Sequence, residues 1–444
     1  MTNSDESVNR GSVSTPSSTT SGALSVDLDD RLLPSNLAAE EMQLALNKEA
    51  GETELQTAIS RCKELVLEND QCSLERKWLV RHLIELRLRL QECRDALNDP
   101  QHPRNLSSGA STRTVRGHHL HLQPLLSTSS HYCDHCTGTI WSVVQAWYQC
   151  EDCGYNCHHK CISSIIRECA HVTVTEKGGY ECDICPEVGL SGQKYQCAEC
   201  KSSLSIAAPK GLVCFGRLFF IDALWSEARK CDYSGLYYCS ACHWGSSAVI
   251  PARVIHNWDF IPQYVCQASL QLLRLSSHLP LINLEKLNPS IFTVVHELKL
   301  VRRLRNELNG MRKYLLVCRD AEESHFIWKN VDKPHIIESP NLYSLQDLVD
   351  TQSGELPTKL HSLSHIFSEH IKMKCEVCKG RGHICEVCSN EEILFPFDVN
   401  ASICNVCGVV LHKSCAARRK KCPKCLRLEQ RKQDLVDAKD EDDL

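Results

Sequence analysis

Residues 385–425 read Cys385-x2-Cys388, then Cys404-x2-Cys407, then His412-x2-Cys415, then Cys422-x2-Cys425. These are eight ligand-type side chains in four close pairs. Zinc takes four thiolate or imidazole ligands at tetrahedral angles, and a gap of two residues lets both side chains of one turn face the same ion. Four such pairs in succession predict two structural zinc sites.

Length, charge and cysteine content bound the rest of the chain. Its 444 residues suffice for about two to four domains, and 50 basic against 55 acidic residues give a net charge of −5. This balance does not favour nucleic acid as a partner. We expect a cytoplasmic protein, because the N-terminus lacks the features of a signal peptide and no apolar run reaches about 18 residues. In that compartment 29 cysteines, with nine CxxC pairs in two blocks, indicate metal binding and not disulfides.

The first hundred residues contain few ligands. Residues 1–36 are rich in Ser and Thr and lack an apolar period, which predicts disorder. Residues 37–98 form a helical segment, in which Leu79, Leu83, Leu86 and Leu90 recur three and four apart. This stripe covers too few heptads for a coiled-coil dimer, so we expect a helix packed on its neighbour. Residues 99–117 are a polar linker.

A second ligand-rich unit spans residues 118–170. Its spacing is Cys133-x2-Cys136-x13-Cys150-x2-Cys153-x4-His158-x2-Cys161-x7-Cys169, preceded by histidines. Eight ligands predict two zinc ions. From Cys133 onward the spacing resembles the C1 (phorbol-ester/diacylglycerol-type) zinc finger at every step.

The C1 resemblance implies interleaved ligand sets. One ion would be held by His119, Cys150, Cys153 and Cys169, and the other by Cys133, Cys136, His158 and Cys161. His118 and His121 are rivals of His119 for the first position.

Lipid-binding C1 domains carry a Gln-Gly pair shortly before the third cysteine, where this chain has Ala146 and Trp147. A bulky residue where the loop needs glycine should change or close the lipid groove. We therefore expect an atypical C1 domain with a structural or protein-binding role. The alternative is an apolar tip around Trp141 and Val144 that touches a membrane.

The next block, residues 181–262, offers more ligands than two zinc ions need. The candidates are Cys185, Cys197, Cys200, Cys231, Cys239, Cys242 and His243. His256 is a further candidate, and Cys182 is the weakest.

Short motifs in and after this block resemble the Rubicon-homology domain. They are Tyr238-Cys239-x2-Cys242-His243, Ile250-Pro251-Ala252-Arg253, Asn257-Trp258-Asp259-Phe260 and Phe395-Pro396-Phe397. Together with the C1-type unit, they resemble the Def-eight branch of that family (differentially expressed in FDCP cells) across about residues 60–430. The apolar stretch at 211–225 departs from the pattern. The resemblance places one domain at 181–430.

The middle of this domain, residues 263–372, is predicted to be a helical layer. Apolar residues recur every three or four positions from Phe292 to Leu315, which predicts a helix of about six turns that starts after Asn288-Pro289-Ser290. The layer leads to the finger at 375–425, and residues 431–444 are an acidic tail.

A further zinc ion is expected just before the opening stretch. Cys375 and Cys378 lie between His370 and His383, either of which can complete the site. Unpaired cysteines in helical contexts are expected to be small buried apolar residues. These are Cys62, Cys72, Cys93, Cys266 and Cys318.

The fold class expected from these features is a set of small zinc-stabilised α+β modules. An atypical C1 finger and a Rubicon-homology domain, with zinc fingers flanking a helical layer, follow an N-terminal helical segment.

The Rubicon-homology resemblance implies a non-enzymatic adaptor that binds Zn²⁺. Such proteins bind a late-endosomal Rab-type small GTPase through this domain, act in late endosome and lysosome trafficking or positioning, and lie peripherally on those membranes. Other lysosomal adaptors are further expected partners. The residues show no nucleophile–base pair and no phosphate loop, which agrees with a scaffold.

Two alternatives follow from the zinc fingers. One is an adaptor that reads phosphoinositide or diacylglycerol at an anionic membrane surface: the basic residues at 418–424 suggest the phosphoinositide contact, and the C1-type unit the diacylglycerol contact. A cross-braced finger ending in Cys-Pro-x-Cys also occurs in RING ubiquitin ligases, but the four residues between Cys407 and His412 argue against a RING.

Overall fold

The computed structural model describes residues 50–100, 102–103, 112–124, 131–142, 144–205, 226–388, 390–419 and 421–442. The chain divides into two compact units, Met1–Pro100 and Gln101–Leu444, which are described separately. The segment predicted to be disordered, 1–36, and the apolar stretch 211–225 lie outside the described residues. No described helix is both long and apolar enough to cross a bilayer. Mixed helices and strands with Cys/His clusters at zinc-finger spacing confirm the predicted fold class.

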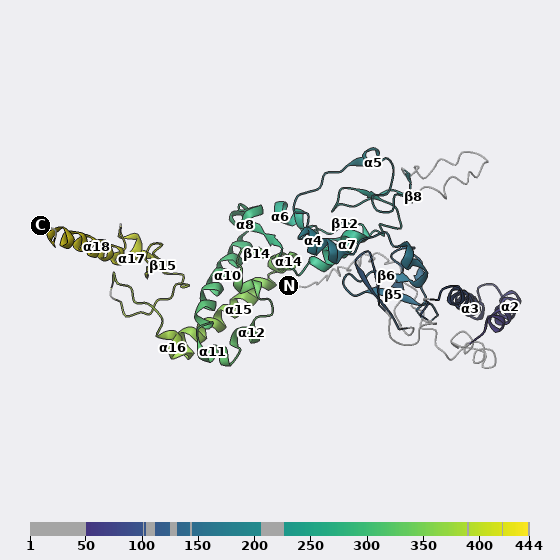
Figure 1. Ribbon diagram of the computed structural model, residues 1–444, viewed down its shortest axis with the longest axis horizontal. Helices are drawn as coiled ribbons and strands as arrows, with labels where there is room; N and C mark the ends of the chain where they lie inside the picture. The colour runs from purple at the N-terminus through teal and green to yellow at the C-terminus, as the bar shows by residue number, and fades with distance from the viewer. Residues whose placement is uncertain are drawn as a thin grey trace, which may run out of the picture. The chain divides into compact units, whose positions relative to one another are not determined.

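The first unit is a pair of helices, α2 (Glu52–Glu68) and α3 (Leu74–Asn98) (Figure 1). Ser73 caps α3, because its side chain accepts a hydrogen bond from the backbone N–H of Arg76. The two helices pack through Leu55, Cys62 and Leu86, which are buried. The turn between them holds Cys72, whose thiol is exposed, so the prediction of a buried Cys72 was wrong.

The second unit opens with an antiparallel four-stranded sheet of order β1-β2-β5-β6. Its strands are β1 (Thr112–Val115), β2 (His118–Leu122), β5 (Trp147–Cys150) and β6 (Asn156–His158). The short pair β3 (His131–Tyr132) and β4 (Thr139–Ile140), the 3-10 helix η2 (His159–Ser164) and helix α4 (Ala170–Lys177) complete this module. Its small core contains five cysteines beside seven other apolar or aromatic side chains, so bound metal should carry much of its stability.

The next segment is made of two-residue strands around three helices. The strand pairs are β7 (Leu204–Ser205) with β8 (Ser226–Glu227), β9 (Arg229–Lys230) with β10 (Tyr237–Tyr238), and β11 (Ser247–Ala248) with β12 (Gln263–Tyr264). The helices are the short α5 (Gly189–Gly192), α6 (Pro251–Asn257), which starts at the Pro of the Ile-Pro-Ala-Arg motif, and α7 (Gln267–Ser276).

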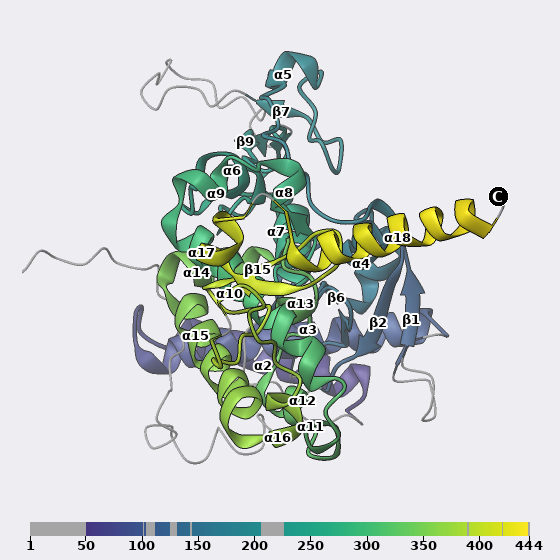
Figure 2. The ribbon, with the colours of Figure 1, turned by 90° about the vertical axis from the view of Figure 1, so that its left-hand side faces the viewer.

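The largest core belongs to a helical layer built on α10 (His296–Leu315) and α15 (Glu355–Glu369), which lie side by side (Figures 1 and 2). The layer also contains α8 (Leu284–Leu287), α9 (Ile291–Val294), α11 (Arg319–Glu323), α12 (Phe326–Asn330), α13 (His335–Glu338), α14 (Leu345–Ser353), the π-helix η3 (His370–Lys374) and the strand pair β13 (Ile282–Asn283) with β14 (Leu342–Tyr343). The predicted six-turn helix is broken at Val295, whose backbone is extended and which serves as C-cap of α9 and N-cap of α10.

Arg305 ties the layer together from the inside. Its side chain is fully buried, and its guanidinium donates to the backbone carbonyls of His335, Ile336, Ser339 and Leu342. A buried cation needs such compensation. These hydrogen bonds hold residues 335–342 against α10.

The chain ends in a finger of α16 (Glu376–Lys379), β15 (Ala401–Ile403), β16 (Val410–His412), α17 (Lys413–Ala417) and α18 (Pro423–Asp442). Phe395 and Phe397 join the finger to α10, because both are buried in the core of the helical layer and pack edge-on against Tyr314. Gly310 permits this approach: a Cβ there would lie 3.1 Å from the Cβ of Phe397.

Candidate metal centres

The CxxC pairs fold into the same tight turn in different modules. The backbone N–H of the residue after the second cysteine donates to the carbonyl of the first: Thr137 to Cys133, Gly154 to Cys150, Lys201 to Cys197 and Gly408 to Cys404. These four donor residues have φ between +60° and +74°. Glycine adopts this conformation freely, whereas Thr137 and Lys201 do so at a cost of about 1–3 kcal/mol. The turn aims both thiols at one point.

The first cluster in the chain gathers His118, Cys150, Cys153 and Cys169, whose ligand atoms all lie within 4.8 Å of one another. His118 Nδ1 is 3.3 Å from Cys153 Sγ, and the sulfurs of Cys150 and Cys169 are 3.9 Å apart. Two ligands of a tetrahedral zinc ion with Zn–S bonds of ~2.3 Å are separated by about 3.8 Å. The residues therefore fit zinc.

The assignment of His119 to this cluster was wrong. His118 and His119 are neighbours on β2, where successive side chains point to opposite faces. His118 is buried, and its Nε2 lies 3.2 Å from the carbonyl oxygen of Arg167, which orients the ring. His119 is on the exposed face, where its hydrogen bond to Asp152 raises its pKa. His121 lies on that face too and pairs with Glu151.

Exchanging each histidine for alanine tests this assignment. His118→Ala should bind one zinc ion fewer than the native chain, because only three ligands would remain. His119→Ala should keep the native metal content, since it removes only an exposed ion pair with Asp152. Metal per chain, measured by atomic emission on the purified full-length variants, distinguishes the two. Loss of metal from His119→Ala alone would reverse the assignment.

The second cluster gathers Cys133, Cys136, His158 and Cys161. His158 Nδ1 lies 3.4 Å from Cys136 Sγ and 3.9 Å from Cys161 Sγ, and its Nε2 is 3.3 Å from the carbonyl oxygen of Thr139. With the first cluster, this arrangement interleaves the ligands along the chain.

The third cluster is formed by four cysteines, Cys197, Cys200, Cys239 and Cys242. The sulfurs of Cys200 and Cys239 are 3.5 Å apart. Three other predicted ligands stay outside this cluster and have other neighbours. Cys231 lies beside Cys266 and Ser269, and the Cys266 thiol lowers the pKa of Cys231 to about 4.

His243 and Cys185 also have other contacts. Both ring nitrogens of His243 face the backbone, with Nε2 3.1 Å from the carbonyl oxygen of Lys230 and Nδ1 accepting from the N–H of Gly245. Cys185 Sγ lies 3.9 Å from the carbonyl oxygen of Asp183. His256 contacts the carbonyl oxygen of Cys182.

The fourth cluster joins two ends of the helical layer. It contains Cys318, His370, Cys375 and Cys378. Cys318 Sγ is 3.5 Å from His370 Nε2 and 3.6 Å from Cys375 Sγ. Cys318 was predicted to be only a buried apolar residue, and that prediction was incomplete. His383 lies elsewhere, in a β-bridge with Leu394.

The opening stretch forms the last two clusters. Cys385 and Cys388 meet His412 and Cys415, with Cys388 Sγ 3.3 Å from His412 Nδ1. The other four cysteines face each other in two pairs: Cys404 is 3.7 Å from Cys425, and Cys407 is 3.5 Å from Cys422, sulfur to sulfur. The first ligand pair of the stretch thus meets the third pair, and the second pair meets the fourth pair, across the hairpin of β15 and β16. This is a cross-brace.

Comparison with known proteins agrees with this geometry. The Rubicon Homology Domain model matches residues 229–430, and the model of the phorbol esters/diacylglycerol binding domain (C1 domain) matches residues 121–172. A Drosophila melanogaster protein, "Differentially expressed in FDCP 8 homolog", is 41% identical over 428 residues, which cover 93% of this chain and 82% of that protein. The chain belongs to the Differentially expressed in FDCP 8 homolog family. The family resemblance seen in the sequence is confirmed.

Other relatives share less of their length with this chain. The Caenorhabditis elegans protein of the same name is 35% identical over 325 residues, 71% of this chain and 64% of that protein. The Homo sapiens "Pleckstrin homology domain-containing family M member 3" is 34% identical over 247 residues, 55% of this chain and 30% of that protein.

In this member of the Differentially expressed in FDCP 8 homolog family, the C1-type module departs from the lipid-binding pattern at Trp147. That side chain is buried in the module core and stacks on the ring of His131, with centroids 4.6 Å apart. A buried indole is a packing element. It is not a flexible loop position next to a ligand groove.

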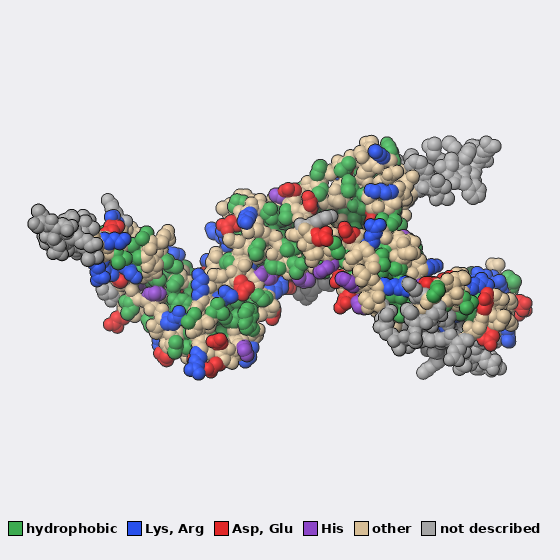
Figure 3. Space-filling model, viewed as in Figure 1, with side chains coloured by type: hydrophobic (Ala, Val, Ile, Leu, Met, Phe, Trp, Pro, Cys, Tyr) green, Lys and Arg blue, Asp and Glu red, His purple; other side chains and the backbone are tan. Residues whose placement is uncertain are grey.

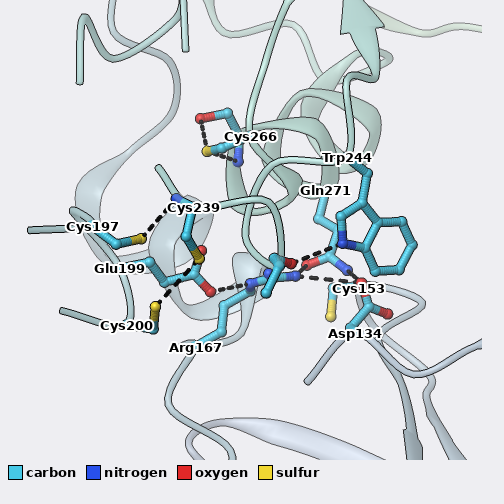
Figure 4. Close-up of polar contacts among 12 residues, drawn as sticks. Asp134, Cys153, Arg167, Cys197, Glu199, Cys200, Cys239, Trp244, Cys266 and Gln271 are labelled. Carbon is cyan, nitrogen blue, oxygen red and sulfur yellow. Dashed lines mark hydrogen bonds and ion pairs between the residues drawn. The ribbon is translucent and has the colours of Figure 1, made fainter. Parts of the chain in front are cut away.

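The C1-type module and the following cysteine block are joined by Arg167 (Figure 4). Its side chain is only 4% exposed. Nε donates to Glu199 at 2.7 Å, and Nη1 lies 3.4 Å from Asp134 Oδ1 and 3.3 Å from Gln271 Oε1. Asp134 lies between Cys133 and Cys136, and Glu199 lies between Cys197 and Cys200. One arginine therefore connects two metal-cluster turns with α7, which carries Gln271.

Proposed function

We propose that this chain is a non-enzymatic, zinc-binding adaptor of late endosome and lysosome trafficking that docks a Rab-type small GTPase through its C-terminal domain. The observation that carries the proposal is the match of the Rubicon Homology Domain to residues 229–430, the part of the chain that contains the helical layer and its flanking clusters. The lack of a described membrane-spanning helix is compatible with peripheral attachment to those membranes.

The ligand sets support a structural use of the metal. Each of the six clusters described above has four protein ligands. Catalytic zinc sites keep one position open for water or substrate, whereas structural sites are closed by four protein ligands. We infer that zinc maintains the shape of this protein and does not act on a substrate.

A groove between the helical layer and the finger is the GTPase contact that we propose. It has a volume of about 450 Å³ and is lined by Lys299, Arg302, Arg303, Asn306, Glu307, Pro396, Phe397, Asp398, Val399, Ala401 and Lys413. Lys299, Arg303 and Lys413 are exposed, while Arg302 pairs with Glu285 and packs over the ring of Phe292. A mixed apolar and cationic groove suits a protein surface that carries acidic side chains around an apolar centre.

This groove depends on both of its walls. Phe397 is held in the core of the helical layer, and Lys372 pairs with Asp398 at 2.5 Å. Val399 at the groove edge is 61% exposed. Loss of the finger would remove about half of the residues that line the groove. The finger would therefore contribute to GTPase binding through the shape of the groove, without contacting the nucleotide.

Binding to a late-endosomal Rab-type GTPase, loaded with GDP or with a non-hydrolysable GTP analogue, tests the proposal. The native full-length chain should prefer the GTP form. Lys299→Glu combined with Arg303→Gln should weaken binding by about tenfold, ~1.4 kcal/mol, with a smaller effect at high salt. The control is Lys359→Glu, an exposed lysine on α15 that lines a separate groove.

The two parts of the proposal fail separately. Equal binding of both nucleotide forms by the native chain would exclude the GTPase adaptor function. A retained GTP preference with unchanged affinity of the double variant would exclude only this groove.

A further inference from the structure

The finger exposes apolar side chains at the tip of its last metal cluster. Val406 lies between Cys404 and Cys407 and is 86% exposed, and Ile403, directly before Cys404, is 49% exposed. The turn is held by the hydrogen bond from the N–H of Gly408 to the carbonyl of Cys404. A single exposed apolar residue is ordinary on protein surfaces. Val406 on the turn between two cysteines of the cluster and Ile403 at the end of β15 are both held in place by the fold, so they are presented together.

The same cluster is surrounded by positive charge. Residues 400–432 contain nine basic residues and one acidic residue, Glu429. Arg418, Arg419 and Lys421 are exposed, and Lys and Arg side chains gather on this finger (Figure 3). Lys421 pairs with Glu429, but no ion pair is seen for Arg418 or Arg419 with any residue that the structure describes.

The geometry of the last metal cluster places a basic side chain close to the exposed apolar turn at Val406. The sulfurs of Cys407 and Cys422 are 3.5 Å apart, and those of Cys404 and Cys425 are 3.7 Å apart. Lys424 lies between Cys422 and Cys425, so the turn that carries it faces the turn that carries Val406 across one metal site.

A second CxxC turn of this chain offers a matched comparison that differs in charge. Cys182-Asp183-Ile184-Cys185 also exposes an apolar residue at its third position, and Ile184 is 50% exposed. Its neighbours are acidic, namely Glu181, Asp183 and Glu187. An anionic surface would repel this turn and attract the one at Val406.

We propose that the Val406 turn inserts into an anionic phospholipid surface, with Arg418, Arg419 and Lys424 lying among the headgroups. Apolar side chains at the tip gain from leaving water, and basic residues beside them gain from the negative surface potential. A uniformly acidic protein surface would satisfy the charges, but it would leave the exposed aliphatic side chains of Val406 and Ile403 without an apolar partner. This site is separate from the proposed GTPase groove and does not depend on it.

Vesicle co-sedimentation of the zinc-loaded full-length chain tests the proposal. The vesicles are pure phosphatidylcholine, phosphatidylcholine with phosphatidylserine, and phosphatidylcholine with diacylglycerol. The native chain should bind only the phosphatidylserine vesicles, and less at high salt. Val406→Asp should lower binding by on the order of tenfold, because the aliphatic contact is lost. Arg418→Glu with Arg419→Glu should lower it by at least about 25-fold.

The matched control is Ile184→Asp, the same kind of change at the same position of the acidic turn, which should bind as the native chain does. Unchanged zinc content in every variant shows that the fingers are intact. The proposal is overturned if the native chain ignores phosphatidylserine, or if Val406→Asp binds as well as the native chain. Binding driven by diacylglycerol and insensitive to Val406→Asp would instead assign membrane contact to the C1-type module.

Discussion

The Cys318→Ser variant should bind one zinc ion fewer than the native chain and should unfold at lower temperature and lower denaturant concentration. Cys318 follows the C-terminus of α10, and its sulfur lies 3.6 Å from that of Cys375, which follows η3. Metal bound at this cluster would link the two ends of the helical layer. Structural zinc contributes on the order of 10 kcal/mol or more to the folding of small zinc modules, so loss of one ligand should destabilise the layer by several kcal/mol.

Cys157→Ser is the control for this result. Cys157 is fully buried, as Cys318 is, but it belongs to neither cluster of its module. The Cys157→Ser variant should be somewhat less stable than the native chain, because a buried thiol becomes a hydroxyl. It should keep all of its zinc. Atomic emission gives the metal content and circular dichroism gives the melting curve. A Cys318→Ser variant with native zinc content would remove Cys318 from the ligand set.

Arg167→Met should destabilise the second unit by about 3–5 kcal/mol without loss of metal. The substitution leaves the carboxylates of Asp134 and Glu199 largely buried with no cation between them. Burial already raises the pKa of Asp134, and Arg167 opposes that shift. Urea unfolding of the zinc-loaded full-length chain measures the effect.

Arg319→Met is the comparison, since Arg319 is 88% exposed and pairs with Glu323 within one helix turn. Exposed pairs contribute little, so this variant should remain close to native stability. Equal stability of both variants would mean that the Arg167 network does not hold the modules together. A fragment that begins at residue 181 lacks Arg167 while keeping Glu199 and Gln271, so partner-binding assays should use the full chain.

The local parts of the metal sites could be read from the sequence, because a CxxC turn is closed by bonds within five residues. The turn from Cys404 to Gly408 is an example. Helix positions were also readable, since the apolar period from Leu298 to Leu315 follows the buried face of α10. The break between α9 and α10 at Val295 could not be predicted from the sequence, because one extended residue inside an apolar period leaves no pattern of its own.

The sequence did not determine which of several neighbouring or distant side chains completes a ligand set. His118 and His119 are chemically identical, and only the strand register decides which of them faces Cys153. Cys318 lies 52 residues from His370 along the chain. No spacing rule covers that distance, and the packing of α10 on α15 brings the two together.

The sequence by itself determined that this chain carries Cys/His pairs at zinc-ligand spacing in two blocks, that a helical layer separates the blocks, and that the family is the one with a C1-type and a Rubicon-homology domain. Those properties reside in short spacings and periodic patterns. Only the tertiary structure decided which histidine completes the first cluster, that Cys318 completes the fourth, and that Arg167 joins two metal-cluster turns. Each of these depends on which face of an element a side chain occupies, or on a contact between segments far apart in the chain. Tertiary packing determines both, and the local sequence does not.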